Sequence, residues 1–293
     1  MARERYRFNT PAGRAFDVAN VVVLTVIGLV AVLPFLYVMA GSFATEAELS
    51  RRAFFVWPEE WTLESYRSIL SSPAFVRAMV TTILVTLVGT AIQLLLTVTM
   101  AYPLSKKTLP GRNLVLGMVV VTLVFSAGMI PTFLIVRELG LLNTYWALVL
   151  PMAINPFSLI IIKNFFQAMP PELEESARID GATDVGVLWR IVLPLSKPVL
   201  ATFTLFYAVG IWNDFMSPLL YLNDPDMWTL QVFLRQVTAG AEMVAGEVDP
   251  NYVPPEQGMK LAVIAVATLP VLLFYPLLQK HFAKGMLIGS VKG

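Results

Sequence analysis

The chain has 293 residues, of which 57% are hydrophobic and 14% are charged, and its net charge at pH 7 is +1. A soluble protein of this length rarely has so many hydrophobic and so few charged residues. The composition therefore predicts an integral membrane protein. No compact basic patch for nucleic acid is present. Cysteine is absent and His281 is the only histidine, which excludes disulfides, thiol catalysis and a typical zinc site.

Six apolar stretches reach the length of about 20 residues that a helix needs to cross a bilayer. Five are free of charge, and the sixth is interrupted only by Asp214. Barrel strands would be half as long and would alternate in polarity. We therefore expect an all-α integral membrane protein with six transmembrane helices, in a domain of residues 18–293 that follows an N-terminal arm of residues 1–17. The six stretches are 18–45, 78–105, 113–136, 139–162, 199–222 and 261–279.

The distribution of lysine and arginine predicts the orientation, because these residues concentrate on the cytoplasmic side. With the N-terminus inside, 14 of the 21 basic residues lie on the inner side and 7 on the outer side. Both termini, residues 170–198 and the tail 281–293 are then cytoplasmic. A cleaved signal peptide is the alternative for the first stretch, which is too long for a signal core and lacks a clear cleavage site. The seven outer residues are Arg51, Arg52, Arg67, Arg77, Arg137, Arg235 and Lys260.

The first outer loop, residues 46–73, carries Trp57, Trp61 and Tyr66 among charges. Such aromatic residues are typical of the membrane interface. An amphipathic helix over residues 63–70 is expected to lie there.

Small and helix-breaking residues interrupt the third and fourth stretches. Ser126, Gly128 and Pro131 can bend the third or let another helix approach closely, and ordinary small-residue packing explains them equally well. The Asn155-Pro156 pair in the fourth stretch has the same interpretations: a bend or close approach of another helix, or ordinary packing. Pro110-Gly111 forms the turn of the inner loop that precedes the third stretch.

Residues 170–198 form the one long polar segment between two apolar stretches that is not an outer loop. We expect two short helices, with an elbow at Gly181 because glycine tolerates unusual backbone angles. Pro170 and Pro171 suit the start of the first helix, and three glutamates follow in its first turn. The second helix is expected to be capped by Asp180, Thr183 or Asp184 and stopped by Pro194 and Pro198.

Three parts of this segment resemble the cytoplasmic EAA loop in the membrane subunits of ABC importers: Glu175-Ser-Ala177, Asp180-Gly181-Ala182 and Ile191-x-Leu193-Pro194. In that family the loop docks into a cleft on a separate ATPase subunit and transmits its closure. Ser176 departs from the pattern, where alanine is more common. An amphipathic helix on the membrane surface is the alternative interpretation. The resemblance implies that coupling to the ATPase rests on Glu175, Ala177, Asp180, Gly181, Ala182, Leu193 and Pro194.

The fifth stretch contains Trp212-Asn213-Asp214-Phe215. An ionisable side chain within a membrane helix usually faces the bundle interior or a watery cavity. A continuous helix from Val199, rising about 1.5 Å per residue, would place Asp214 in the outer half of the membrane. The run is similar to a Trp-Asn-Glu/Asp-Phe signature of sugar-importing ABC permeases, which implies that Trp212, Asn213 and Asp214 line or gate the translocation path. A carboxylate that reaches outer interfacial water is the alternative.

The second outer loop, residues 223–258, is long and acidic, and its residues 227–237 are expected to form an amphipathic helix. In the maltose-type permease that it resembles, this loop approaches the solute-binding protein. The tail, residues 284–293, resembles the glycine-rich C-terminus that reaches between the two ATPase subunits in that family. A solvated loop and a flexible tail are the alternatives.

The chain contains no G-x-x-x-x-G-K-[ST] phosphate loop, and its one histidine provides no Ser/His/Asp set. No catalytic residue and no cofactor are therefore expected in it. The resemblance implies a type I ABC importer fold and a permease subunit in the bacterial inner membrane. It also implies a second permease subunit, two ATPase subunits that bind ATP and magnesium, and a solute-binding protein as partners, within membrane lipid and without nucleic acid.

The implied substrate is an oligosaccharide, and the outer loop and C-terminal region resemble permeases that include importers of acidic polymers such as alginate. Arg137, Lys163 and Arg235 are the basic candidates near the path. The alternative function is a secondary transporter or channel that works without an ATPase. Acidic pairs deep in the helices, expected of a proton-coupled carrier, are absent from the sequence.

Overall fold

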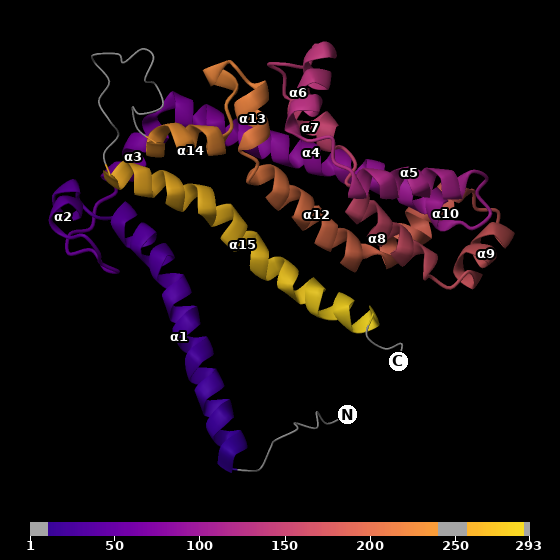
Figure 1. Cartoon of the computed structure of the whole chain (residues 1–293), viewed down its shortest axis with the longest axis horizontal. Coiled ribbons are helices and arrows are strands. Elements are labelled where there is room, and N and C mark those ends of the chain that lie inside the picture. Colours follow the sequence, from indigo (N-terminus) through magenta and orange to yellow (C-terminus); the bar gives the residue numbers. More distant parts are fainter. Residues whose placement is uncertain (1–10, 240–256, 290–293) are drawn as a thin grey trace. The chain divides into compact units, whose positions relative to one another are not determined.

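The computed structural model describes residues 11–239 and 257–289, with side chains for residues 13–238 and 257–273 (Figure 1). Over these residues the chain is helical, and the one β-type contact there is an isolated antiparallel bridge between Ala44 and Trp61. The predicted all-α class is confirmed. The chain divides into two compact units. One combines the N-terminal part up to Ser71 with the start of the last helix, and the other combines Ser72–Ala239 with the rest of that helix.

The first unit contains the long apolar helix α1 and three shorter elements near its C-terminal end. Helix α3 confirms the amphipathic helix expected over residues 63–70. The carboxylate of Glu46 accepts hydrogen bonds from the backbone N–H groups of Gln257 and Gly258, both at 3.1 Å. It thereby satisfies two of the unpaired donors at the start of the last helix. The elements are α1 (Pro11–Ser42), α2 (Glu46–Arg51), α3 (Glu64–Ser71) and the first residues of α15 (Gln257–Gly289).

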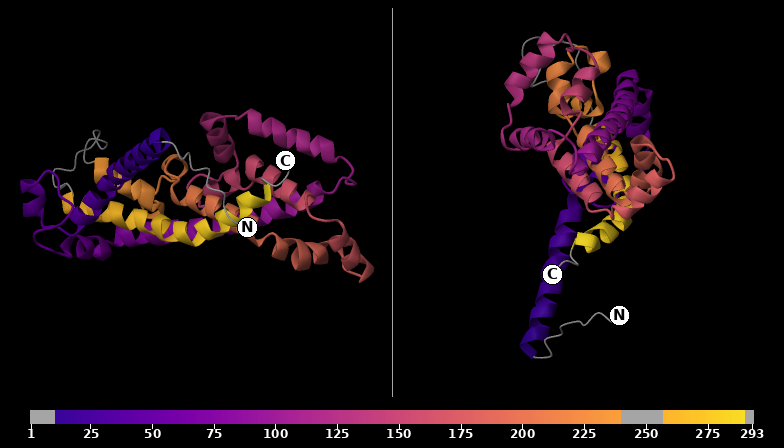
Figure 2. Two further views of the ribbon diagram at one scale, coloured as in Figure 1. Left: turned by 90° about the horizontal axis from the view of Figure 1, so that it is seen from below. Right: turned by 90° about the vertical axis from the view of Figure 1, so that its right-hand side faces the viewer.

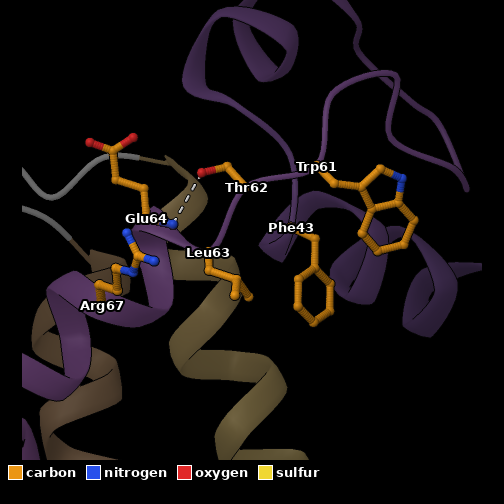
Figure 3. A pocket seen from close by; sticks show the side chains of 6 residues that line it. All are labelled: Phe43, Trp61, Thr62, Leu63, Glu64 and Arg67. Carbon is orange, nitrogen blue, oxygen red and sulfur yellow. Dashed lines mark hydrogen bonds between the residues drawn. The ribbon is translucent and has the colours of Figure 1, made fainter.

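An open pocket of about 820 Å³ lies between α1 and α3 in this unit (Figure 3). Phe43 and Trp61 form an aromatic wall with ring centres 5.6 Å apart, and Trp61 remains half exposed. Glu64 and Arg67 of α3 lie at the opposite side of the pocket. Exposed tryptophan beside charged side chains is typical of the membrane–water interface, as expected for this loop.

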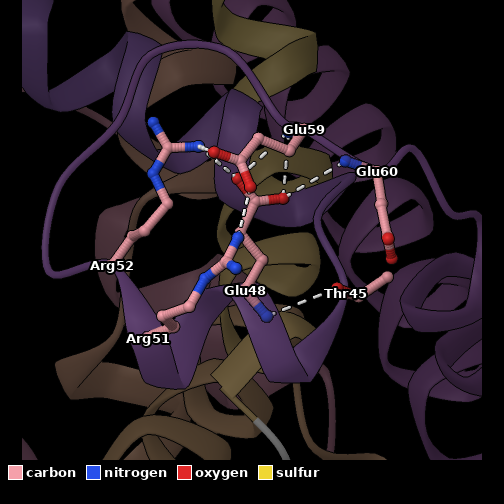
Figure 4. A network of polar contacts seen from close by, with 6 residues as sticks. All are labelled: Thr45, Glu48, Arg51, Arg52, Glu59 and Glu60. Carbon is pink, nitrogen blue, oxygen red and sulfur yellow. Dashed lines mark hydrogen bonds and ion pairs between the residues drawn. The ribbon is translucent and has the colours of Figure 1, made fainter.

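A buried carboxylate folds the loop after α2 back onto that helix (Figure 4). Glu48, which is 3% exposed, accepts hydrogen bonds from the backbone N–H of Glu59 at 3.0 Å and of Glu60 at 3.4 Å. The guanidinium of Arg52 donates to the same carboxylate at 2.6 Å. Burial raises the pKa of Glu48, but the backbone amides and Arg52 outweigh this effect and hold the pKa below its ordinary value.

We predict that Glu48→Gln lowers the thermal stability of the protein at pH 7 and that the difference shrinks in acid. A carboxyl whose pKa is depressed by folding contributes stability above its unfolded pKa of about 4.3, and this stability is lost as the pH falls through the folded-state pKa. The measurement is the melting temperature in detergent between pH 7 and about pH 3. Glu60→Gln, at an exposed position, is the control. A pH-independent difference between wild type and Glu48→Gln would contradict the prediction.

The second unit is organised around α4 (Pro73–Ser105), a helix of 33 residues. It packs along α8 and α12, which lie beside it in all three views (Figures 1 and 2). One buried cluster contains Tyr102, Ile162 and Tyr207, and a second contains Val85, Leu148 and Tyr221. The other elements are α5 (Arg112–Val124), α6 (Met129–Glu138), α7 (Trp146–Val149), η1 (Leu150–Met152), α8 (Pro156–Gln167), α9 (Glu172–Ile179), α10 (Asp184–Val187), η2 (Leu188–Val192), α11 (Leu193–Leu195), α12 (Lys197–Trp212), α13 (Met216–Tyr221), η3 (Pro225–Met227) and α14 (Leu230–Ala239).

Three of the six predicted membrane stretches, the third, fourth and fifth, are broken helices. By length and composition, Gly13–Ser42 and Pro73–Ser105 can each cross a membrane as single helices. Three bent pairs bring the number of spans in the described part of the chain to at most five, if each pair counts as one. The pairs are Arg112–Val124 with Met129–Glu138 at 118°, Trp146–Met152 with Pro156–Gln167 at 53°, and Asp184–Leu195 with Lys197–Trp212 at 84°.

Of the alternatives left open for the third stretch, the structure shows the bend, at residues 125–128, where Gly128 adopts a φ of 84°. The fourth stretch breaks before Pro156, where Asn155 caps α8. The helix expected over residues 227–237 is α14. The expected end of the last helix at Gln279 was wrong, since the residues after it continue the helix to Gly289 without a proline to stop it.

Some expectations fall outside the described residues. These are residues 1–10 of the N-terminal arm, 240–256 of the second outer loop and 290–293 of the tail. The remainder of the expected arm belongs to α1, which begins at Pro11.

Candidate functional site

The polar segment of residues 170–198, called here the coupling segment, lies at one end of the second unit (Figures 1 and 2). It folds as the two predicted helices joined at Gly181, whose φ of 84° lies in the left-handed region. Of the three predicted caps, Thr183 caps the second helix, and its hydroxyl accepts a hydrogen bond from the N–H of Gly186 at 3.2 Å. Asp180 instead ends α9, and Asp184 pairs with Arg178 at 2.8 Å.

The second helix ends at Leu195, between the two prolines expected to stop it, but Pro194 itself lies within the helix. The second helix passes through a π-helical turn at Leu188–Val192 and continues as α11 to Leu195. Pro194 has no N–H to donate, and its ring would crowd the carbonyl four residues earlier. The wider π turn lies where that carbonyl must be displaced. The sharp bend comes at Ser196, before α12 begins.

The predicted coupling residues fall on two sides of this segment. Ala177, Ala182 and Leu193 are partly buried and pack against the cluster that contains Tyr102. The other four, Glu175, Asp180, Gly181 and Pro194, are exposed. The first group therefore packs against the second unit, and the second group is accessible to solvent.

Large apolar side chains are also exposed on the coupling segment. Ile179 is 86% exposed, Val185 is 66% exposed and Trp189 is 54% exposed. Val185 and Trp189 are four residues apart and share a helix face. Exposed apolar side chains surrounded by polar ones are typical of a surface that contacts another protein.

Two ion pairs tie the coupling segment in place. Lys106, at the end of α4, pairs with Glu174 of α9. Arg178 pairs with Asp184 across the elbow, and this hydrogen bond raises the pKa of Arg178. A pocket of about 520 Å³ lies between the end of α4 and the segment, and Tyr102, Lys106, Arg178 and Trp189 are among its lining residues.

The second feature is a break in the fifth predicted stretch, where a continuous helix was expected. Helix α12 ends at Trp212 and α13 begins at Met216. The Asp214 carboxylate accepts a hydrogen bond from the N–H of Ser217 at 3.2 Å, so it satisfies a donor at the start of α13 that a continuous helix would have paired internally. The position of Asp214 in the outer half of the membrane was derived from a continuous helix, and this derivation therefore does not apply.

A pocket of about 470 Å³, called here the break pocket, lies between this break, the break before α8 and the middle of α4. Gln93 comes from α4, Asn155 from the start of α8, and Asp214 from the α12–α13 break. Gln93 is 5% exposed. Tyr207 and several apolar side chains complete the lining. A small set of polar groups in a largely apolar cavity suits a ligand that forms directional hydrogen bonds.

The structure separates the three predicted path residues. Asp214 lines the break pocket, but Trp212 and Asn213 do not. Trp212 is buried, and its Nε1–H donates to the backbone carbonyl of Ala267 at 3.0 Å. Asn213 is exposed, and its side chain donates to the carbonyl of Val209 at 2.9 Å.

Sequence analysis did not identify Gln93 and Asn155 as path residues. Gln93 was detectable as the one amide side chain within the apolar stretch 78–105. Asn155 was considered only as part of a possible bend. Its side chain caps α8, accepting from the N–H of Ser158 at 3.0 Å.

None of the basic candidates lines the break pocket. Arg137 pairs with Glu138 at 2.9 Å, and Lys163 is buried on α8. Arg235 lies nearest to the break, with its guanidinium 4.8 Å from the ring centre of Phe215. Within the described residues no three His, Cys, Asp or Glu side chains come together as metal ligands.

The family model described as "Binding-protein-dependent transport system inner membrane component" matches residues 7–288. The chain therefore belongs to this family of ABC importer permease subunits, as the resemblance of the coupling segment had indicated.

Relatives match over nearly the whole length. The chain is 62% identical to Protein LplC of Bacillus subtilis (strain 168), with 100% of both chains covered. It is 51% identical to the polygalacturonan/rhamnogalacturonan transport system permease protein YtcP of the same organism, with 96% of this chain and 99% of the relative covered. A crystal structure of a bacterial ABC transporter involved in the import of the acidic polysaccharide alginate contains a chain that matches with a TM-score of 0.86 at 31% identity, covering 94% of this chain and 99% of that one.

We predict that Gln93→Leu in the assembled transporter lowers the transport rate roughly tenfold or more, because leucine cannot form a hydrogen bond with a substrate in the break pocket. Asp214→Asn, which keeps an oxygen to cap α13, is expected to lower transport while preserving thermal stability. Uptake of radiolabelled substrate into vesicles is the measurement.

The control is Leu87→Met, an apolar change on the exposed side of the same helix. If Gln93→Leu transports at the wild-type rate, the break pocket is not part of the path.

Proposed function

We propose that this chain is one of two permease subunits of an oligosaccharide importer in the bacterial inner membrane. Two separate ATPase subunits would bind ATP and magnesium, and a solute-binding protein would deliver the substrate from outside. The observation that carries this proposal is the coupling segment, where a glycine elbow presents exposed acidic and apolar side chains. Family membership supports the general role, and the missing phosphate loop supports a separate source of ATP hydrolysis.

The ATPase contact follows from the two sides of the coupling segment. Ala177, Ala182 and Leu193 hold the segment against the second unit. Glu175, Asp180 and Ile179 are exposed beyond it. A partner that buries Ile179 and Trp189 would remove two large apolar side chains from water, each worth about 1.5–3 kcal/mol when fully buried. This surface is the proposed docking site of the ATPase.

We further propose six membrane spans with both termini in the cytoplasm. Helices α1 and α4, the bent pairs formed by Arg112–Val124 with Met129–Glu138 and by Trp146–Met152 with Pro156–Gln167, and α12 with α13 would supply five spans, and α15 would supply the sixth. The proposed orientation rests on the 14 basic residues assigned to the inner side against 7 on the outer side. It places the coupling segment where an ATPase can reach it.

The proposed path runs through the break pocket, by alternating access. Broken helices expose backbone groups and helix ends, which in transporters line the substrate site. Here two breaks meet at Gln93, Asn155 and Asp214. ATP-driven closure would move the coupling segments together and open the path outward, and hydrolysis would return it to the inward state. Trp212 and Asn213 would act at the margin of this path.

The proposed substrate is an oligosaccharide that contains uronic acids. The 51% identical relative is named for polygalacturonan and rhamnogalacturonan, and the similar crystal structure is of an importer of acidic alginate. Hydroxyl groups suit the amides of Gln93 and Asn155. Arg235, held above Phe215 beside the break, is the proposed partner of a carboxylate.

We predict that Gly181→Pro leaves membrane insertion intact and abolishes substrate-stimulated ATP hydrolysis. Proline fixes φ near −65°, whereas the elbow has a φ of 84°. Gly181→Ala, which pays about 1–2 kcal/mol for the left-handed conformation, should show a partial loss. Gly186→Ala, in the same segment but without a positive φ, is the control. Normal coupling in Gly181→Pro would refute the docking proposal.

Purification of the tagged chain from its native membranes in mild detergent tests the assembly. We expect a phosphate-loop ATPase and a second permease subunit to co-purify. Vesicles containing this complex and the binding protein should import oligogalacturonate with ATP and exclude an uncharged oligosaccharide of equal length. Transport by the isolated chain without ATP would instead establish a secondary transporter. Preference of the complex for the uncharged oligosaccharide would contradict the proposed uronic-acid substrate but not the proposed importer.

A further inference from the structure

We propose that Lys106 is a positioning residue for energy coupling: its ion pair with Glu174 links α9 of the coupling segment to α4, the helix that lines the break pocket. This inference rests on the proposed function. It adds a second connection to the covalent one, in which the coupling segment continues through Ser196 into α12.

The Lys106–Glu174 pair is better shielded from water than the other ion pair of the segment. The side chains of Lys106 and Glu174 are 26% and 12% exposed, whereas those of Arg178 and Asp184 are 50% and 72% exposed. Exposed ion pairs contribute little, whereas removing one partner of a shielded pair is costly because the other charge is left without its counter-ion. Lys106 is therefore expected to matter more for coupling than Arg178.

The pair also joins α9 of the coupling segment to a helix outside that segment. Among the described residues it is the one ion pair between α9 and a helix outside the coupling segment. On the inner side of α9, Ala177 supplies only a methyl group to the buried cluster. A pocket of about 520 Å³, lined by Lys106 and by Arg178 of α9 among others, lies beside the pair. The ion pair therefore adds a charged contact to the packing of Ala177.

Lys106 itself is held firmly. Its backbone N–H donates to the carbonyl of Pro103 at 3.0 Å, and its ammonium lies 4.6 Å from the ring centre of Tyr102. Arg112 braces the turn after Lys106, donating to the carbonyl of Leu104 at 2.8 Å and to the side chain of Gln167 at 3.0 Å. Displacement of the Lys106 ammonium group is therefore expected to move α4, because the turn after Lys106 is held in place.

Helix α4 connects this end to the proposed path. Gln93 lies 13 residues before Lys106, about 20 Å along a straight helix. Between them, the Thr97 hydroxyl lies 3.0 Å from the Tyr207 hydroxyl of α12. Beyond Gln93, Gly89 lets α12 approach so closely that an added Cβ would lie 2.8 Å from Ile211. Movement of α9 relative to α4 is therefore expected to displace both α4 and α12, which line the break pocket.

The test uses the complete transporter, reconstituted in vesicles with its ATPases and binding protein. We expect Lys106→Met and Glu174→Gln each to lower the substrate transported per ATP hydrolysed roughly fivefold or more. The matched controls are Lys107→Met and Glu172→Gln, exposed neighbours with the same charges. The double variant Lys106→Glu with Glu174→Lys restores the opposite charges and is expected to recover most of the coupling.

The outcomes separate this inference from the proposed function. A wild-type complex without ATP-dependent transport would overturn the proposed function. A coupled wild type together with an equally coupled Lys106→Met would overturn only the role of Lys106. If Lys106→Met fails to assemble with the ATPases, the charge-swapped variant decides: recovery of assembly and coupling supports the pair, and failure to recover them overturns it.

Discussion

Backbone hydrogen bonding inside the membrane is the constraint on which this structure depends. Every N–H and C=O group must find a partner where water is absent, so a helix can break only where side chains satisfy its ends. At each break around the pocket a side chain pairs one of the freed backbone donors. Asn155 accepts from the N–H of Ser158 at the start of α8, and Asp214 accepts from the N–H of Ser217 at the start of α13. The side chains that permit the breaks are also the polar groups of the break pocket.

The same helix, α4, supports both candidate functional regions. Its N-terminal part bonds to α14 through the Thr82 hydroxyl, which accepts from the N–H of Leu230 at 2.7 Å. Its middle part supplies Gln93 to the pocket, and Lys106 at its C-terminal end pairs with the coupling segment. One continuous helix of 33 residues is stiffer than the broken helices around it. The proposed mechanism therefore assigns the moving parts to the segments that are already interrupted.

The coupling segment shows how one residue can serve fold and function together. Gly181 forms the left-handed turn that joins α9 to α10, and Ile179 and Asp180 just before it are exposed. The acidic first turn of α9 contains Glu174, turned inward to Lys106, and Glu175, turned outward. Two neighbouring glutamates thereby take different positions, because successive residues of a helix point in different directions.

The sequence by itself determined the helical class, the family, the glycine elbow and the two outer amphipathic helices. These follow from local properties: apolar length, proline and glycine chemistry, and the spacing of a motif. Only the tertiary structure decided that the fifth stretch breaks after Trp212, that Pro194 is absorbed by a π turn, and that Trp212 packs on α15 while Gln93 enters the pocket. A single sequence does not specify which face of an apolar helix meets which neighbour, because nearly every side chain along it is compatible with lipid and with packing alike.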